Sequence, residues 1–247
     1  MFPGTGDLLT LLPKLSFNKT IIMDNLPVHS EAFKVRMHAS LRLGITESAI
    51  VKVAKHKNIY RCGDKANTVY FIESGLIKLL MSSPEGKECL LAIHTAGDVF
   101  GELCLCGARE RLETAIAMRE TIVRAILCHK FIVHLNANSL LADFVGYLVA
   151  RLAERDKTIA NLITADSEHR LGEILIQLAG KIGKPAPPGT RIEQRFTHEE
   201  LSEMVGTTRP RITEFLQRFR KLGLVEISPE HHLIVKQDKL IKHLIIQ

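Results

Sequence analysis

The sequence has few of the features that mark secreted, membrane-spanning or repetitive proteins. Its five cysteines are an odd number without paired spacings, which fits a reducing compartment better than a disulfide framework. No apolar run approaches the ~18 residues that a transmembrane helix needs, and we expect no membrane partner. The N-terminus lacks a charged segment followed by an apolar stretch and a small-residue cleavage site, so export is not expected. With no internal repeats either, the sequence predicts a cytoplasmic protein.

The chain does have enough apolar residues for a folded core and an excess of positive charge. Its 247 residues are 46% hydrophobic, which suits one large domain or two small ones. The net charge is +6 and the isoelectric point is near 9.1. This charge permits a polyanionic partner, although it does not by itself demand one.

The clearest local pattern lies towards the C-terminal end of the chain, where two short helices joined by a tight turn are expected. Thr197 is followed three residues later by Glu200, a capping-box pattern that predicts a first helix from about residue 198 to 205. Gly206 is expected to end this helix, because glycine readily adopts the positive φ of a C-cap.

A second helix is expected directly afterwards, with Thr208 as its N-cap and Pro210 in its first turn, where a missing N–H costs little. Apolar residues at helical spacing predict its buried stripe, which consists of Ile212, Phe215, Leu216 and Phe219. The remaining charged residues face solvent or a partner, and they are Arg209, Arg211, Glu214 and Arg218.

This arrangement is typical of a DNA-binding helix-turn-helix, whose second helix enters the major groove. Between residues 205 and 221, five Lys or Arg residues stand against one acidic residue, and arginine suits bidentate contacts with guanine. Two β-prone runs follow, at 223–227 and 233–235, and resemble a two-stranded wing. We therefore predict a winged helix-turn-helix with double-stranded DNA as its partner. The alternative is an ordinary helical hairpin with a solvated charged face.

The whole chain divides into four parts, at residues 1–40, 41–137, 138–166 and 167–247. In the first part, prolines and glycines interrupt any regular pattern. The second contains short β-prone runs separated by turn signals, which predict a sandwich or barrel. The clearest of these runs are 69–72, 76–80, 89–93 and 121–127. The last part is the DNA-binding module, with a first helix expected at 168–179 and a loop at 181–189.

Residues 138–166 change to helical periodicity. Apolar residues recur at spacings of four and three, and only Arg155 interrupts them. The predicted seam consists of Leu141, Val145, Leu148, Leu152, Ile159 and Leu162. A seam of this length, on a helix between two domains, predicts a homodimer interface. The alternative is a single helix packed against its own domain.

Four segments of the β-prone part carry a resemblance to a known family. They are Tyr60–Asp64, Val69–Gly75, Gly86–Glu88 and Gly97–Leu103. Together with the long helix and the helix-turn-helix that follow, they resemble the cyclic-AMP receptor protein and fumarate-nitrate regulator (CRP/FNR) family over roughly residues 45–240. The resemblance implies an α+β fold, with an N-terminal jelly-roll sensor domain (a β-roll) of the cyclic-nucleotide-binding type, a dimerisation helix and a C-terminal winged helix-turn-helix. It also implies a transcription regulator that binds a two-fold symmetric operator as a homodimer and contacts RNA polymerase.

In cyclic-nucleotide-binding relatives, a Gly-Glu-Leu segment opens the phosphate-binding cassette and an Arg-Ser or Arg-Thr pair closes it. This sequence matches the opening and the last two positions of the close, at Gly101, Glu102, Leu103, Thr114 and Ala115. However, Glu113 stands where the phosphate-binding arginine is expected, and a carboxylate there would repel the phosphate. We therefore expect the response to cyclic AMP to be lost.

Two alternatives remain open for this degenerate effector pocket. Arg155-Asp156 stands where the cyclic-AMP receptor places a Thr-Ser pair against the base. In the first alternative, the pocket still binds an anion through Arg155 or through Arg111, if the slightly longer loop shifts its register. In the second, Glu113 and Arg155 pair with each other and fill the pocket. The effector, if there is one, is unknown.

The resemblance also implies roles for the residues of the second helix. Arg209 matches the arginine that reads guanine in cyclic-AMP receptor proteins. Pro210 and Glu214 replace a base-reading glutamate and a second base-reading arginine, so the half-site is expected to differ from the usual family sequence. Arg211 is expected to contact a base or a phosphate, and Arg218 a phosphate. The further predicted DNA-binding residues are Thr197, Thr207 and Thr208.

Other chemistries known in this family find little support. Residues 1–61 contain no cysteine, whereas iron–sulfur members carry an N-terminal cluster. Cys104 and Cys106 are expected on a strand, and we expect buried thiols there rather than a metal site or a thiol switch. No histidine is marked as a haem ligand, and we predict no metal or cofactor.

A cupin-type enzyme would need a second histidine near His94 and Glu102, so no enzymatic activity is expected. The arginine-bearing helix disfavours a signalling subunit without DNA binding.

Overall fold

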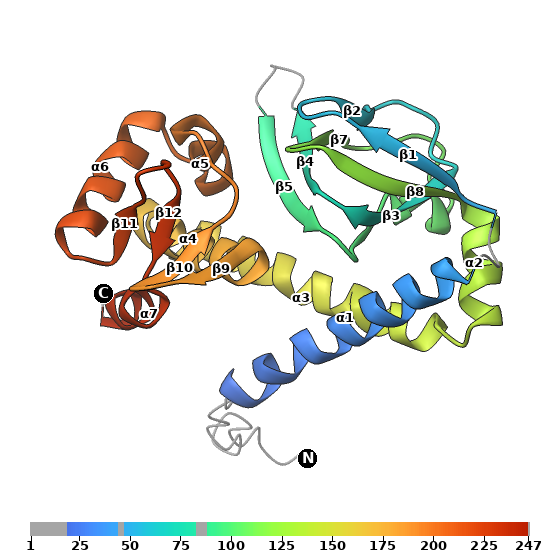
Figure 1. Cartoon of the computed structure of the whole chain (residues 1–247), viewed down its shortest axis with the longest axis horizontal. Coiled ribbons are helices and arrows are strands. Elements are labelled where there is room, and N and C mark those ends of the chain that lie inside the picture. The colour runs from blue at the N-terminus through green and yellow to red at the C-terminus, as the bar shows by residue number, and fades with distance from the viewer. Residues whose placement is uncertain (1–18, 44–46, 83–87, 247) are drawn as a thin grey trace, which may run out of the picture.

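The computed structural model describes residues 19–43, 47–82 and 88–246 of the chain. The β-roll, a long helix and a C-terminal helical domain follow one another along its longest dimension (Figure 1). Each end has its own hydrophobic core, because separate clusters of buried residues lie in the β-roll and in the C-terminal domain. The predicted α+β fold is confirmed.

The N-terminal part contains a helix, α1 (Lys19–Arg42), where the sequence predicts no regular pattern. That prediction is wrong for the described residues, and positions 1–18 lie outside them. The helix continues through Pro27. Phe33, Met37 and Leu41 recur every four residues, and all three are buried in the core of the β-roll. The part of helix α1 from Phe33 to Leu41 therefore packs on the sensor domain.

The β-roll consists of two four-stranded antiparallel sheets, with strand orders β1-β8-β3-β6 and β2-β7-β4-β5. All four predicted β-prone runs are strands. Gly75, between β3 and β4, has a φ of 118°, and a Cβ there would lie 2.2 Å from Thr121 Oγ1. Only glycine fits this turn. The strands are β1 (Ala49–Val53), β2 (Asn58–Tyr60), β3 (Thr68–Ser74), β4 (Leu76–Ser82), β5 (Glu88–Thr95), β6 (Val99–Phe100), β7 (Thr114–Ala117) and β8 (Thr121–Leu127).

Two short helices interrupt the part of the chain that was predicted to be strand-like. A 3-10 helix, η1 (Glu102–Cys106), carries Cys104 and Cys106, so the prediction that these residues lie on a strand is wrong. After β8 the chain forms α2 (Cys128–Ala137), which buries Phe131 and Leu135 against the roll.

The long helix α3 (Leu141–Thr164) confirms the predicted helical segment. Phe144, Tyr147 and Ala150 are buried against the β-roll and α1. The aromatic rings of Phe33 and Tyr147 lie 4.9 Å apart between centroids. Within the described residues, no single helix is long and apolar enough to cross a membrane. The one pair of helices that meets this criterion together, α2 with α3, is bent by 118°.

The C-terminal domain combines four helices with a four-stranded antiparallel sheet of order β11-β12-β10-β9. The helices are α4 (Ser167–Ile182), α5 (His198–Val205), α6 (Arg209–Lys221) and α7 (Gln237–Ile246). The predicted two-stranded wing is present as β11 (Val225–Ile227) and β12 (Leu233–Val235). The predicted loop at 181–189 is wrong, because it contains the end of α4 and a hairpin of β9 (Gly183–Ala186) with β10 (Gly189–Ile192).

Candidate nucleic-acid interface and effector pocket

Helix α5 begins with the predicted capping box. The backbone N–H of Glu200 donates to Thr197 Oγ1 at 3.1 Å, and the N–H of Thr197 donates to the Glu200 carboxylate at 2.8 Å. Gly206, with a φ of 68°, ends the helix as predicted. Since both ends are fixed by local hydrogen bonds and backbone geometry, the turn into α6 is well defined.

The second helix, α6, buries its apolar stripe and exposes its charged side as the sequence predicts. Its four apolar residues, Ile212, Phe215, Leu216 and Phe219, all lie in the core of the C-terminal domain. Arg209, Arg211 and Glu214 are exposed. Thr208 is the N-cap residue, although its side chain makes no capping hydrogen bond. Thr197 is also exposed, and Thr207 is half-buried.

Arg218 is held by the protein itself. Its Nη1 donates to Glu168 Oε2 at 2.7 Å, and its Nη2 lies 3.8 Å from a Glu214 oxygen. Glu168, in the first turn of α4, is only 7% exposed. Its second oxygen, Oε1, is buried without a hydrogen-bond partner among the described residues. The pair therefore joins α6 to the start of α4, a role that the sequence did not indicate.

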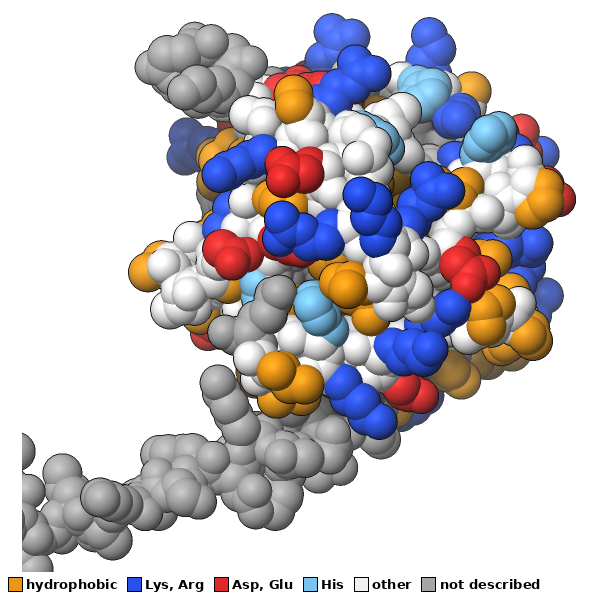
Figure 2. Space-filling model, turned by 90° about the vertical axis from the view of Figure 1, so that its left-hand side faces the viewer, with side chains coloured by type: hydrophobic (Ala, Val, Ile, Leu, Met, Phe, Trp, Pro, Cys, Tyr) orange, Lys and Arg blue, Asp and Glu red, His pale blue; other side chains and the backbone are white. Residues whose placement is uncertain are grey.

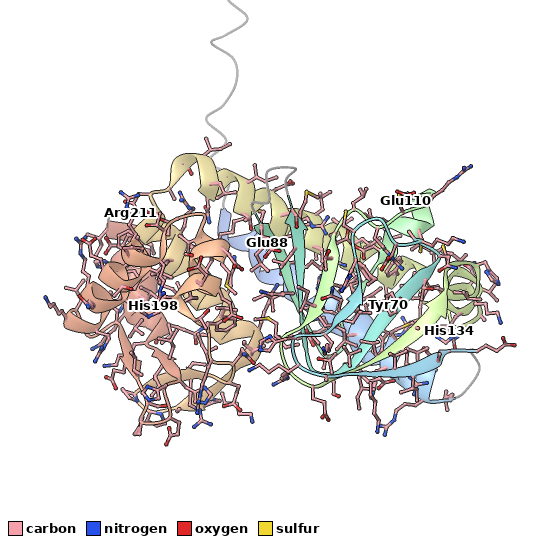
Figure 3. The ribbon with its side chains drawn as sticks, turned by 90° about the horizontal axis from the view of Figure 1, so that it is seen from above. Tyr70, Glu88, Glu110, His134, His198 and Arg211 are labelled. Carbon is pink, nitrogen blue, oxygen red and sulfur yellow. The ribbon has the colours of Figure 1, made fainter. Side chains whose placement is uncertain are left out.

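His198 is a second residue whose position the sequence did not reveal. Its Nδ1 lies 2.8 Å from Thr213 Oγ1, and the Thr213 hydroxyl donates to the Arg209 carbonyl at 3.1 Å. Because that hydroxyl proton is already used, the imidazole is assigned as the donor. The link joins the start of α5 to the first turn of α6, and Figure 3 labels His198 and Arg211 in this domain.

Basic side chains predominate on the end of the molecule that the C-terminal domain forms (Figure 2). A shallow groove of about 530 Å³ lies between α6 and β11 on this domain. It is lined by Gln217, Arg220, Lys221, Val225, Glu226 and Ile227. An exposed helix flanked by a basic groove and a two-stranded wing has the shape and charge for a DNA duplex.

In the β-roll, Arg111 points into the protein. It is 2% exposed, and its guanidinium donates to the carbonyls of Gly101 at 2.8 Å and Thr68 at 2.6 Å. The same group lies over the rings of Tyr60 and Tyr70, at 4.3 and 5.5 Å from their centroids. Gly101 accommodates this arrangement, since a Cβ there would lie 2.6 Å from Arg111 Nη1.

Glu113 is buried beside Arg111 in the same part of the roll, and the hydroxyl of Tyr60 donates to its carboxylate at 2.7 Å. Burial, reinforced by this carboxylate, raises the pKa of Tyr60 far above its usual range. Arg155 is exposed on α3. The alternative in which Glu113 and Arg155 pair with each other is therefore wrong.

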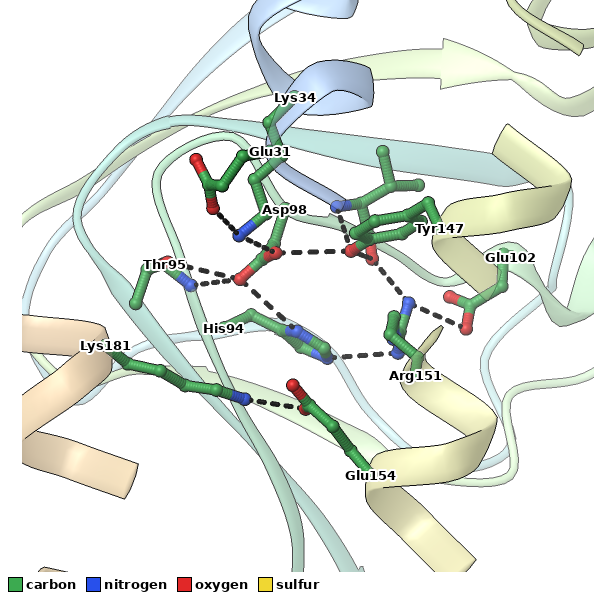
Figure 4. Close-up of polar contacts among 11 residues, drawn as sticks. Glu31, Lys34, His94, Thr95, Asp98, Glu102, Tyr147, Arg151, Glu154 and Lys181 are labelled. Carbon is green, nitrogen blue, oxygen red and sulfur yellow. Dashed lines mark hydrogen bonds and ion pairs between the residues drawn. The ribbon is translucent and has the colours of Figure 1, made fainter. Parts of the chain in front are cut away.

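The arginine of α3 that reaches the pocket is Arg151, one helical turn before Arg155 (Figure 4). Its Nη1 lies 3.1 Å from the Glu102 carboxylate and donates to the Val99 carbonyl at 2.8 Å. Its Nη2 lies 3.3 Å from Nε2 of the buried His94. Glu102, which the resemblance predicts to lie in the effector pocket, is thus already paired within the chain.

A buried carboxylate, Asp98, connects this cluster to α1. It accepts from the backbone N–H of Thr95 at 2.7 Å and lies 3.2 Å from Lys34 Nζ. The Tyr147 hydroxyl of α3 donates at 3.3 Å to Asp98 Oδ1, the same oxygen that Lys34 contacts (Figure 4). Burial alone would raise the pKa of Asp98, but His94, Lys34 and the Thr95 amide outweigh it and hold the pKa well below its usual range. Three elements, α1, α3 and the β5–β6 turn, meet at this carboxylate.

The remaining predicted pocket residues and the cysteines differ in how deeply they are buried. Thr114 Oγ1 accepts from the Cys62 N–H at 3.1 Å, whereas Leu103 is half-buried and Ala115 is buried. The expectation of buried thiols holds for Cys104 only, because three cysteines are exposed and one is half-buried. Burial, together with the neighbouring Cys128 thiol, raises the pKa of Cys104 to about 12. In the described part of the chain, no three His, Cys, Asp or Glu side chains are placed to hold a metal ion.

Comparison with protein-family models identifies both the β-roll and the C-terminal domain. A cyclic nucleotide-binding domain model matches residues 50–133, and a Crp-like helix-turn-helix domain model matches residues 169–242. The global nitrogen regulator of Synechocystis sp. is 30% identical over 185 residues, which cover 70% of this chain and 79% of the relative. The chain belongs to the CRP/FNR family. It is a transcription regulator with a DNA-binding helix-turn-helix.

Two further relatives cover most of this CRP/FNR regulator. A CRP-like cAMP-activated global transcriptional regulator of Mycobacterium tuberculosis is 26% identical and covers 84% of the chain and 97% of the relative. A solved structure of a CooA mutant from Carboxydothermus hydrogenoformans is 26% identical, with a TM-score of 0.68, and covers 80% of the chain and 88% of that protein.

Proposed function

We propose that this CRP/FNR regulator binds a two-fold symmetric DNA operator as a homodimer and does not respond to cyclic AMP. The observation that carries the DNA-binding part is the exposed arginine-bearing side of α6, with Arg209 and Arg211 in its first turn. Arginines there suit contacts with base edges in the major groove. As a regulator of duplex DNA, it is expected to act in the cytoplasm together with RNA polymerase.

The apolar seam of α3 supports the homodimer. Of the six predicted seam residues, five are exposed and only Leu148 is half-buried. Leu152 and Ile159, near the middle of the seam, are 57% and 56% exposed. An uncovered apolar stripe of this length on one helix is best explained by a second copy of the same helix.

Sedimentation of the purified protein tests the dimer. We expect a dimer for the natural sequence and a monomer for Leu152→Glu or Ile159→Glu, which place a charge in the seam. Thr158→Glu, on an exposed position of the same helix outside the seam, is the matched control and should remain dimeric. A natural chain that sediments as a monomer at micromolar concentration would contradict the proposal.

Two internal contacts and one residue replacement support the loss of cyclic AMP binding. Arg111 is engaged by backbone carbonyls, Glu113 takes the place of a phosphate-binding arginine, and Glu102 is paired with Arg151. Calorimetric titration with cyclic AMP and cyclic GMP is expected to show no tight binding, and tight binding of either nucleotide would refute this part.

One observation favours a second candidate, an effector-gated regulator that binds another anion. The Nε of Arg111 is buried and has no hydrogen-bond partner among the described residues, so one donor of the guanidinium is free for a ligand. Comparing calorimetric titrations of the natural protein and Arg111→Lys with small carboxylates and phosphates tests this candidate.

A haem-containing or iron–sulfur sensor of the same family is a different alternative. An absorption spectrum of the purified protein distinguishes it, because either group would colour the protein.

Selection of bound duplexes from a random pool, with and without cell extract, tests the DNA-binding proposal directly. We expect a palindrome whose half-sites lie about one helical turn apart. Enrichment that depends on the extract would point to an effector, and no enrichment under either condition would contradict sequence-specific binding.

A further inference from the structure

The β-roll and the helix-turn-helix touch each other within one chain. Ile93 of β5 packs against the core of the DNA-binding domain. Lys78 Nζ of β4 lies 3.8 Å from Glu203 Oε2 of α5, and their side chains are only 15% and 23% exposed. In Figure 1, α5 is the helix of this domain that faces β5. We call Lys78, Ile93 and Glu203 the interdomain contact.

This contact opposes rotation of the DNA-binding domain about the short segment that joins α3 to α4. Helix α3 ends at Thr164 and α4 begins at Ser167, so the link is short. Two ion pairs join α3 to α4 across the link, Lys181 with Glu154 at 2.9 Å and Lys157 with Glu173 at 2.6 Å. These pairs hold the domain along α3, and the interdomain contact holds it from the β-roll. Rotation about the link must therefore break either the α3–α4 ion pairs or the interdomain contact.

The charges at the contact are complementary. Burial raises the pKa of Glu203 and Lys78 opposes this shift, whereas Glu88, Glu200 and Glu199 add to it. Lys78 is therefore the cation that stabilises Glu203 in an acidic neighbourhood. Replacing it with an acid would place like charges together in a partly buried site.

Glu203 of the contact lies on α5 and not on the recognition helix α6. Glu203 lies near the C-terminal end of α5. None of the residues predicted to bind DNA belongs to the contact, and Arg209, Arg211 and Glu214 remain exposed beside it. The contact can therefore persist when DNA is bound, and it fixes the direction in which α6 points.

We infer that Lys78, Ile93 and Glu203 are positioning residues that set the operator half-site spacing accepted by the dimer. The inference rests on the proposed homodimer. Adding one base pair between half-sites moves them about 3.4 Å apart and turns them by about 35°. A dimer with two fixed recognition helices must reject such a change. A dimer whose DNA-binding domains turn freely tolerates it, but binds its best site more weakly because the aligned arrangement is less populated.

The test compares Lys78→Glu, Glu203→Lys and the charge-swapped double variant with the natural protein. Fluorescence anisotropy at fixed salt gives the affinity for the selected operator and for versions with one base pair added or removed. We expect the natural protein to prefer its own spacing by about 10- to 100-fold. Each single variant should bind the operator about 5- to 20-fold more weakly and lose most of the spacing preference. The double variant, which has the natural net charge, should regain both.

A matched control pair lies on the β-roll far from the DNA-binding domain. Lys65 and Glu110 are exposed neighbours of opposite charge across an isolated β-bridge outside the strands, and Figure 3 shows Glu110 on the β-roll, away from the DNA-binding domain. Lys65→Glu and Glu110→Lys make the same changes in net charge, so they reveal any effect of charge alone on DNA affinity. We expect the spacing preference of both to match that of the natural protein.

Unchanged spacing preference in both single variants would overturn the inference, and so would tighter binding, which would make the contact a restraint on DNA binding. Failure of the proposed function is distinguished separately, because the natural protein would then select no DNA or sediment as a monomer. In that case, energy transfer between labels on the two domains still tests the contact. The single variants should broaden the interdomain distance, the double variant should restore it, and no change in the singles would again overturn it.

Discussion

The pair formed by Arg218 and Glu168 gives the sharpest test of how the recognition helix is held. The sequence pattern predicts that Arg218 contacts a DNA phosphate, whereas its guanidinium lies 2.7 Å from a nearly buried carboxylate of α4. If the pair positions α6, then Arg218→Ala weakens DNA binding by loosening the helix. If Arg218 contacts DNA, the same change removes a phosphate contact. We expect the first result.

The structure sets the size of the effect. Opposite unit charges about 4 Å apart attract by about 4 kcal/mol at an effective dielectric constant of about 20. The Arg218 side chain is 52% exposed, so solvent screening reduces this considerably. The Glu168 side chain is only 9% exposed and would be left without its partner, which raises the loss again. We expect a coupling free energy of about 1–2 kcal/mol.

A double-mutant cycle with Arg218→Ala, Glu168→Gln and both changes measures this coupling by urea denaturation. The salt dependence of DNA binding then separates the two roles, because each phosphate contact contributes about 0.9 to the slope of log K against log salt. We expect both single variants to weaken DNA binding while the slope stays the same. A smaller slope in Arg218→Ala, with no coupling in the stability cycle, would refute the positioning role.

Three further predictions concern buried and exposed polar groups. Tyr60→Phe removes the hydroxyl that donates to buried Glu113, so the free energy of unfolding should fall by about 1–3 kcal/mol; unchanged stability would mean that water replaces the hydroxyl. Despite its burial, Asp98 has a lowered pKa in the fold, so its contribution to stability is complete above pH ~4 and is lost on further acidification. Thermal unfolding of Asp98→Asn should therefore depend less on pH below this value, and equal dependence would contradict the assignment. Arg209→Ala should cost about 1–3 kcal/mol of DNA binding at one base position, whereas an equal loss on all sequences would indicate a backbone contact.

The helix-turn-helix could be predicted because its determinants are local. The capping box of Thr197 and Glu200 and the C-cap at Gly206 each involve residues a few positions apart. The buried stripe of α6 follows from helical periodicity alone. Patterns of this kind are present in the sequence wherever the element forms, so they predict both its type and its boundaries.

Helix α1 and the β9–β10 hairpin could not be predicted, because distant contacts determine them. Both segments contain proline, yet α1 is stabilised where Phe33 meets the rings of Phe144 and Tyr147 on α3, more than a hundred residues later. Pro185 fits within β9 because β9 is the edge strand of its sheet, where a missing N–H disrupts no ladder. Neither fact is visible in the local sequence.

In the pocket, too, the sequence could not predict which side chains contact each other. The sequence identified Arg155 as the arginine of α3 that approaches the effector site, but Arg151, one turn earlier, makes the contact with Glu102. A resemblance gives the approximate position on a helix, whereas the side that faces the roll depends on how the helix packs. For Glu113, the sequence named the wrong partner because Tyr60 is far away in the chain and adjacent only across the sheet.

These internal partners determine what an effector would have to overcome. A cyclic phosphate that bound both Nη groups of Arg111 would break their hydrogen bonds to the Gly101 and Thr68 carbonyls. Hydrogen bonds of a charged group are each worth about 1.5–3 kcal/mol, so the two together amount to about 3–6 kcal/mol. Such a cost weakens affinity by about a hundredfold to ten-thousandfold, before repulsion from Glu113 is added. These hydrogen bonds of Arg111 are therefore the physical reason why we expect no tight binding of a cyclic phosphate in the roll.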